Sequence, residues 1–191
     1  TLHDTTQGIT ATQHTVAALL GIPHVNVRVI GHFVGGSFGS KAMIWHHPTL
    51  AALAARHLGR PVRLALTREQ MFASCGHREE QEQRITLGAD ADGRLTALRH
   101  HKLSPTDDWA EPSLGAASRV YACPAYEGVY RLFRANTMTP TFTRCPGEAT
   151  GLFALESAMD ELAERVGVDP LQLRLRNLAE TDPASGRPWS S

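Results

Sequence analysis

The amino-acid sequence predicts an α+β (mixed α/β) fold, and three patterns carry this prediction. Two runs that alternate between apolar and polar residues flank an Asp-Gly turn within residues 80–103, the pattern of a β-hairpin. Residues 151–167 repeat apolar side chains at spacings of three and four, the pattern of an amphipathic helix. A glycine-rich loop separates a strand pattern from a helix pattern nearer the start. The 191 residues suffice for one sizeable core, or for two small cores that share an interface.

The first elements precede the glycine-rich loop. The stretch TATQHTVAALLGIP predicts a short helix that Thr10 or Thr12 caps and that stops at Gly21. We expect its apolar face to contain Val16, Leu19 and Leu20. The stretch VNVRVIG, residues 25–31, alternates with a period of two and predicts a strand.

Two further elements follow the loop. Residues 40–58 predict a helix, with a bend at Pro48 because proline removes a helical hydrogen bond. Residues 60–68, RPVRLALTR, predict a strand that is buried on both faces, since apolar side chains occupy both alternating sets of positions.

The second half opens with the hairpin, whose turn spans residues 90–93. The stretch YEGVYRLFRANT predicts another strand. The helix of residues 151–167 stops at Gly167. Asp169 followed by Pro170 predicts the N-terminus of a last helix, because aspartate caps the first turn and proline suits its first position.

Composition excludes several classes of protein. Lys plus Arg equals Asp plus Glu at 19 each, which argues against a nucleic-acid-binding surface. No apolar run approaches the roughly 18 residues of a membrane span, and no signal segment opens the chain. Cys75, Cys123 and Cys145 are too scattered for an iron–sulfur or zinc motif; we expect small buried side chains in a reducing compartment. The ten histidines include no zincin pattern, so no side-chain metal ligands are predicted.

The loop GHFVGGSFGSKA, residues 31–42, leaves several interpretations open. Glycine before a helix favours anion binding by backbone N–H groups. The P-loop spacing fails because Lys41 precedes alanine, and the dinucleotide-binding spacing fails at Ser37. A plain strand-to-helix turn remains an alternative.

Four segments in one order carry a resemblance to a known family. They are TTQGITATQ, GGSFGSK, GRPVRLALTREQ and NTMTPTFTRCPGEATGLFALESAMDELAERVGVDPLQLRLRN. Together they resemble the molybdopterin-binding large subunit of the molybdenum hydroxylases, the family of xanthine dehydrogenase, aldehyde oxidase and aerobic carbon monoxide dehydrogenase. The resemblance runs from about Thr5 to Asn177. It identifies the chain as the first part of a molybdopterin-binding domain, with the C-terminal catalytic part absent from residues 1–191.

The resemblance implies a function and a set of partners. The full-length protein would bind a molybdenum–molybdopterin cofactor, in a mononucleotide or dinucleotide form, and oxidise an aldehyde or N-heterocycle with oxygen derived from water. Electrons would leave through iron–sulfur clusters and FAD on other domains or subunits, in a cytoplasmic hetero-oligomer without nucleic acid or a membrane span.

The resemblance also implies the site residues. Gln7 matches the glutamine that donates a hydrogen bond to a molybdenum oxo group, a role that suits an amide because it does not titrate. Gly36, Ser37, Phe38 and Gly39 match the loop that passes over the metal. We expect the loop from Gly35 to Gly39 to form a backbone-lined turn at a cleft, with Gln7 close by and Phe38 excluding water on one side. Thr143 and Arg144 match the second cofactor loop. Alternatives are a surface cap for the glutamine and a structural ion pair for the arginine.

Departures from the family pattern limit this interpretation. Ala42 stands where purine-oxidising members carry an acidic residue, so purines are disfavoured as substrates. Cys145 and Pro146 remove the aromatic contact of xanthine dehydrogenase, and Ser37 interrupts a run of glycines. Glu148 does not occupy the position of the catalytic glutamate, which the family carries in sequence beyond Ser191. We therefore expect no catalytic residue here and an inactive fragment.

Two alternative functions remain open from the sequence. One is a non-catalytic truncated paralogue or assembly module, which the helical C-terminal face would serve. The other is an ordinary nucleotide-binding domain, which both failed loop spacings disfavour.

Overall fold

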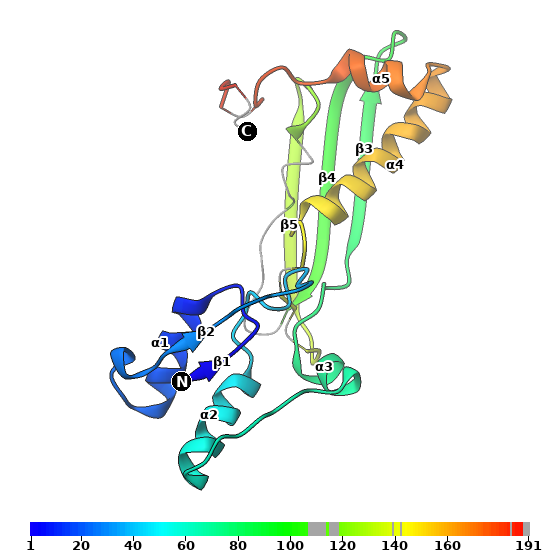
Figure 1. The fold of residues 1–191 in the computed structure, drawn as a ribbon. Coiled ribbons are helices and arrows are strands. Elements are labelled where there is room, and N and C mark those ends of the chain that lie inside the picture. Colours follow the sequence, from blue (N-terminus) through cyan, green and yellow to red (C-terminus); the bar gives the residue numbers. More distant parts are fainter. Residues whose placement is uncertain (107–113, 115–118, 139, 142, 184, 189–191) are drawn as a thin grey trace. The chain divides into compact units, whose positions relative to one another are not determined.

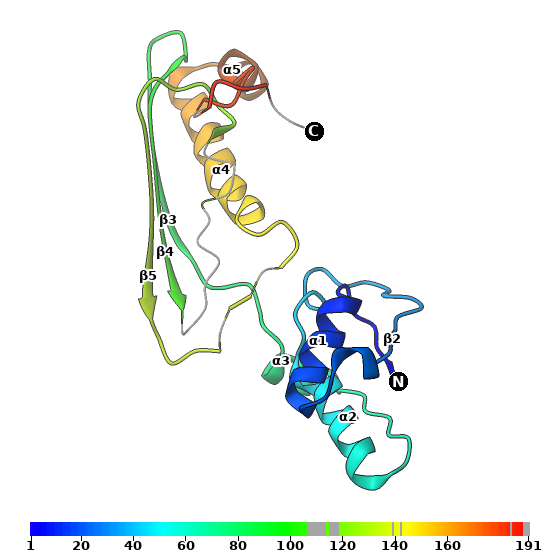
Figure 2. The same cartoon turned by 90° about the vertical axis from the view of Figure 1, so that its left-hand side faces the viewer.

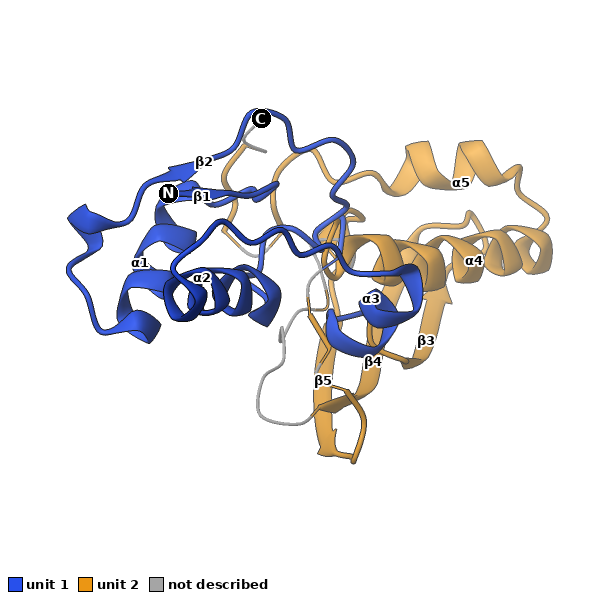
Figure 3. Cartoon of the chain, turned by 60° about the horizontal axis from the view of Figure 1, so that its bottom comes forward, with its two compact units in different colours: residues 1–77, 142–144 blue, residues 78–141, 145–191 orange. Residues whose placement is uncertain are grey.

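The computed structural model divides into two compact units, which we describe separately. Unit 1 comprises residues 1–77 and 142–144, and unit 2 comprises residues 78–141 and 145–191 (Figure 3). Each unit contains its own cluster of buried apolar side chains, so the chain has two small cores. The predicted α+β fold is confirmed. The described residues are 1–106, 114, 119–138, 140–141, 143–183 and 185–188.

Unit 1 consists of short elements joined by long connections (Figure 1). They are β1 (Leu2–His3), α1 (Ile9–Leu20), the 3₁₀ turn η1 (His24–Asn26), β2 (Val29–Ile30), α2 (His46–Leu58) and α3 (Arg68–Ser74). The two strands pair in parallel, with Leu2 opposite Val29. The core of this unit contains Val16, Ala17 and Val27.

Helix α1 ends as predicted but begins differently. Gly21 adopts a left-handed conformation with φ of 63° and closes the helix. The N-cap is Gly8, so the prediction that Thr10 or Thr12 caps the helix is wrong. Thr12 is buried inside α1, where its hydroxyl donates to Thr6 Oγ1 at 3.2 Å. The predicted face is also partly wrong, because Leu19 is 65% exposed.

Three other predictions for unit 1 need correction. The strand of residues 25–31 shrinks to β2, since η1 occupies its beginning. The helix of residues 40–58 begins only at His46, which places Pro48 in the first turn, where proline causes no bend. Residues 61–67 form no strand. Helix α3, which the sequence analysis did not predict, starts with a capping box formed by Thr67 and Gln70.

Unit 2 is a three-stranded sheet with helices on one face. Its elements are β3 (Glu82–Ala89), β4 (Leu95–Thr106), β5 (Tyr126–Arg134), α4 (Glu148–Val166) and α5 (Pro170–Asn177). The strand order is β3-β4-β5, with β3 antiparallel and β5 parallel to β4. Figure 2 shows α4 lying along one face of this sheet.

The elements predicted for unit 2 are confirmed, although α4 begins at Glu148, before the predicted start at residue 151, and β5 ends at Arg134, before the end of the predicted stretch. The turn at Asp90 joins the two strands of the hairpin through the side-chain oxygen of Asp90, which accepts from Asp92 N and Arg94 N. Leu155 and Met159 of α4 are fully buried in the core. Asp169 caps α5 by accepting from Gln172 N at 3.0 Å. The core residues are Leu95, Leu98, Tyr121, Leu155, Met159, Ala163 and Leu173.

Candidate functional site

Gln7 lies in the connection between β1 and α1, and its position follows from the residue before it. Thr6 is buried, and its hydroxyl accepts from Gly8 N at 3.0 Å. The backbone N–H of Gln7 donates to Lys41 O at 2.9 Å. These bonds join the start of α1 to the end of the glycine-rich loop and leave the Gln7 side chain exposed.

The side chain of Gln7 contacts the glycine-rich loop directly. The Ser37 hydroxyl donates a hydrogen bond to Gln7 Oε1. Because the carbonyl end of the amide is occupied in this way, the Nε2 end remains a donor for another group. The expectation that Gln7 lies beside the loop is confirmed.

The loop turns tightly at residues 37–40. Ser40 N donates to Ser37 O at 3.1 Å, and the Ser37 hydroxyl also accepts from Lys41 N at 3.2 Å. Phe38 has a φ of 53° and Gly39 a φ of 100°. A positive φ is unfavourable for phenylalanine, and such strain is found preferentially at functional sites.

The turn presents backbone donors and an aromatic ring. In the described part of the chain, the N–H groups of Gly36, Phe38 and Gly39 donate to no protein acceptor. The Phe38 side chain is 63% exposed. A Cβ added at Gly36 would lie 3.0 Å from the Phe38 ring, so the absence of a side chain at Gly36 leaves room for the ring beside it.

The second predicted loop meets the first through the backbone. Arg144 N donates to Phe38 O at 2.9 Å. Thr143 is half-buried and Arg144 is exposed. Unit 1 therefore brings together Gln7, the turn of residues 36–39 and residues 143–144.

Two residues that the sequence analysis did not select hold this arrangement. Lys41 Nζ donates to Val34 O, which links the two ends of the loop. Thr6 joins the loop to α1, because its hydroxyl donates to Lys41 O at 3.5 Å and accepts from Gly8 N and from the Thr12 hydroxyl. Both residues lie within the motifs TTQG and GSK. A threonine and a lysine at these positions are equally typical of the protein surface, so the sequence did not distinguish a supporting role from plain exposure.

Glu148 and the three cysteines, which the sequence analysis also considered, do not share one environment. Glu148 is the first residue of α4. Cys75 is buried, Cys123 is half-buried and Cys145 is exposed, so the expectation of buried cysteines is wrong for Cys145. Among the described residues, no cluster of three or more histidine, cysteine or acidic side chains could bind a metal ion. No helix among these residues is long and apolar enough to cross a membrane.

The donors of the site fit a group rich in acceptors. The amide Nε2 of Gln7 and the unpaired N–H groups of the turn are neutral donors that do not titrate near neutral pH. Oxo and phosphate oxygens accept such bonds, and small residues let them approach the backbone closely. The residues present therefore suit a molybdenum–pterin group.

Comparisons with known proteins point to the same group. The family model of the molybdopterin cofactor-binding domain matches residues 1–178. The aldehyde oxidoreductase molybdenum-binding subunit PaoC of Escherichia coli is 37% identical over 186 residues, which cover 96% of this chain and 25% of that protein. The chain thus spans a quarter of the length of this relative.

Solved structures resemble the chain over nearly its whole length. The aldehyde oxidoreductase of Desulfovibrio gigas has a TM-score of 0.84 and 28% identity, over 97% of this chain and 22% of that one. The quinoline 2-oxidoreductase of Pseudomonas putida has a TM-score of 0.85 and 28% identity, over 95% of this chain and 24% of that one.

Proposed function

The chain belongs to the molybdopterin cofactor-binding domain family, and on this premise we propose that residues 1–191 supply part of the cofactor site of a molybdenum-dependent oxidoreductase. The observation that carries the proposal is the meeting of three segments in unit 1. Gln7 bonds to Ser37, and Phe38 bonds to Arg144. These segments are distant in sequence, and the two bonds bring them together at one turn.

Each residue has a defined part in this proposal. Gln7 donates through Nε2 to an oxygen of the metal centre, while Ser37 holds the amide in the orientation that permits it. Gly36 and Gly39 let the backbone approach the cofactor, and their N–H groups donate to its oxygens. Phe38 limits access of water on one side. Thr143 and Arg144 contact the pterin portion.

When bound, the molybdenum–pterin group supplies oxygen transfer and two-electron oxidation. The chain's own contribution is to bind and orient this group, because no proton-accepting residue of the family pattern falls within residues 1–191. A general base typically contributes about 10²–10⁴-fold to a rate. We therefore expect the chain by itself to be inactive toward aldehydes and N-heterocycles.

The proposed substrate of the full-length protein is an aldehyde. The relative from E. coli and the structure from D. gigas are named as aldehyde oxidoreductases. Ala42 lacks the carboxylate that a purine would require. An N-heterocycle remains the alternative, since one similar structure is named as a quinoline oxidoreductase. Iron–sulfur and FAD subunits or domains are the proposed electron carriers.

The test uses the longer native polypeptide, purified with the subunits that accompany it. We expect molybdenum and pterin in amounts stoichiometric with the polypeptide, and turnover of an aldehyde with an artificial electron acceptor. The control is an aldehyde oxidoreductase produced in the same host. If the control carries cofactor and this protein carries neither metal nor pterin, the protein is a non-catalytic module instead.

A further inference from the structure

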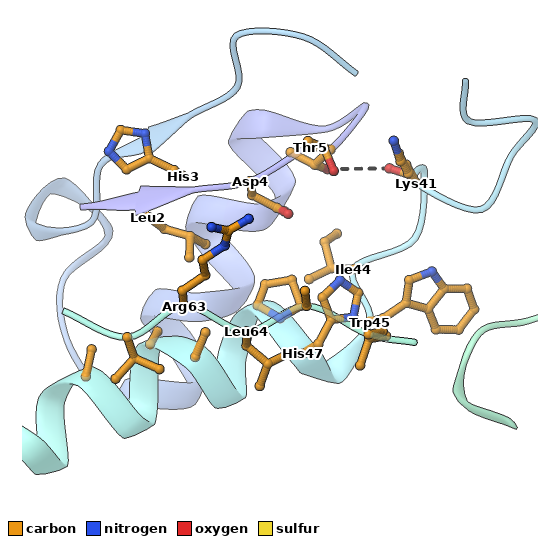
Figure 4. A pocket seen from close by; sticks show the side chains of 18 of the residues that line it. Leu2, His3, Asp4, Thr5, Lys41, Ile44, Trp45, His47, Arg63 and Leu64 are labelled. Atoms are coloured by element: carbon orange, nitrogen blue, oxygen red, sulfur yellow. Dashed lines mark hydrogen bonds between the residues drawn. The ribbon is translucent and has the colours of Figure 1, made fainter. Parts of the chain in front are cut away.

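Unit 1 contains an apolar groove that shares Thr6, Ser40 and Lys41 with the supports of the proposed cofactor site but contains none of the proposed cofactor contacts. Its volume is about 700 Å³. It is lined by residues 1–6, by residues 61–66 and by one face of α2, together with Ser40, Lys41, Met43, Ile44, Trp45, Met71 and Cys75. Figure 4 shows the segment with Arg63 and Leu64 running across α2, with β1 on the other side of the opening. The α2 residues in the lining are His47, Pro48, Ala51, Ala52 and Ala55.

Residues 61–66 have the sequence pattern of a buried strand, but some of their apolar side chains are exposed. The run PVRLAL places apolar side chains at nearly every position, which is typical of a strand covered on both faces. In the structure, Leu64 is 41% exposed and Ala65 is exposed. Apolar side chains in an extended segment are therefore left without the cover that their pattern requires.

The backbone of the same segment is also unpaired. Among the described residues, no backbone hydrogen bond involves residues 61–66. Peptide groups of a strand that is to be buried need partners, because an unpaired buried peptide group is costly. Residues 61–66 thus lack both the burial of their apolar side chains and the backbone hydrogen bonds to a neighbouring strand.

β1 leaves a second edge open along the same groove. Leu2 N donates to Arg28 O at 2.7 Å, and Asp4 N donates to Ile30 O at 3.1 Å. In a parallel ladder alternate residues face the partner strand, so the peptide groups of His3 and Thr5 face away from β2. Two open extended segments therefore line one groove.

We propose that this groove is a β-augmentation site for an extended strand of the same protein, supplied by polypeptide outside residues 1–191. Such a strand offers periodic donors and acceptors to an open edge, which a small molecule does not. The small side chains of Ala51, Ala52 and Ala55 leave room for larger apolar side chains on its inward face. The relative PaoC is about four times as long as the matched region, which makes such a source available. This inference does not depend on the cofactor proposal.

Amide hydrogen exchange in the longer native polypeptide tests the pairing. The amides of Val62 to Leu66 should exchange about tenfold or more below their intrinsic rates, because a ladder now protects them. The variant Ala65→Pro, which removes one N–H, should lose this protection. Ala65→Ser keeps the N–H and should retain it. Exchange of the wild-type segment at intrinsic rates would overturn the proposal.

Photo-cross-linking from position 64 identifies the occupant. We expect the product to join this position to one segment of the same polypeptide outside residues 1–191, at every protein concentration. The same photo-reactive residue at position 19, where Leu19 is exposed, should not reach that segment. A cross-link to residues 1–191 whose yield grows with protein concentration would show that a second copy occupies the groove. Protection of the Val62 to Leu66 amides that appears only with an added small molecule would show that the groove is a ligand pocket. Either result overturns the proposal.

Discussion

Arg144 N donates a hydrogen bond to Phe38 O at 2.9 Å, which attaches the second proposed cofactor loop to the strained turn of the first. This bond uses the backbone of both residues and leaves both side chains exposed. The two loops can therefore be held in register whatever the side chains bind.

The first prediction concerns the Gln7 amide. In the longer native polypeptide, Gln7→Ala should lower turnover more than it lowers molybdenum content. Loss of one preorganised donor near developing charge commonly costs about 3–4 kcal/mol in the transition state, whereas the remaining backbone donors still bind the cofactor. Steady-state rates and metal analysis measure the two effects. The exposed Gln172 of α5 provides the control variant Gln172→Ala, and full activity of Gln7→Ala at normal loading would remove Gln7 from the mechanism.

The second prediction concerns Ser37 as the residue that orients this amide. Ser37→Ala removes the donor to Gln7 Oε1 and lets the amide rotate, so turnover should fall at unchanged molybdenum content. The fall should be smaller than for Gln7→Ala, because the amide still samples the productive orientation. In the double variant the two effects should not add, since Ser37 acts through Gln7. Additive losses would show that Ser37 acts independently.

The third prediction concerns the core of unit 2. Leu155 is fully buried between α4 and the sheet. Leu155→Ala should lower the free energy of unfolding by about 2–5 kcal/mol, because it removes buried methyl groups and leaves a cavity. Phe153 on the same helix is 77% exposed, so Phe153→Ala should leave thermal unfolding nearly unchanged. An unchanged midpoint for Leu155→Ala would contradict the burial of this side chain in the core of unit 2.

The sequence predicted unit 2 well because its signals are local. The Asp-Gly turn, the helical spacing around Leu155 and the Asp169 cap each act within a few residues. Unit 1 was predicted less well because its elements depend on distant partners. β2 is only two residues long, and its register comes from pairing with β1. Residues 61–66 lack such a partner in the described chain, so their strand pattern produces no strand.

The sequence predicted which residues form the candidate site, but not the hydrogen bonds that hold them together. Four ordered motifs resembled one family, which selected Gln7, the loop and Arg144 together. Their proximity is confirmed by the bonds of Ser37 and Phe38. The supports Thr6 and Lys41 were missed, because their role depends on the loop conformation. Phe38 adopts a positive φ, which no local propensity of phenylalanine indicates.

The last prediction concerns His100 and pH. His100 is fully buried on β4, and its Nε2 lies 2.7 Å from Gln83 Oε1. The pKa of His100 is lowered, chiefly by burial and further by the neighbouring charges of Lys102 and His101. Lys102 forms an ion pair with Glu79, with Nζ 3.2 Å from Oε1. The folded state therefore favours the neutral imidazole.

The sign of the pH dependence follows from this lowered pKa. Below about pH 6.5 the unfolded chain binds a proton at this histidine that the folded chain does not accept. The contribution to stability is then present above about pH 6.5 and is lost as the pH falls toward the folded-state pKa, with a slope of at most about 1.4 kcal/mol per pH unit. Denaturant unfolding between pH 7.5 and 5 should show a shallower loss of stability for His100→Gln than for the wild type. The exposed His57 of α2 supplies a matched control variant, His57→Gln, which removes a histidine without touching the core. Equal slopes for wild type and His100→Gln would mean that His100 accepts a proton in the folded state as readily as in the unfolded chain.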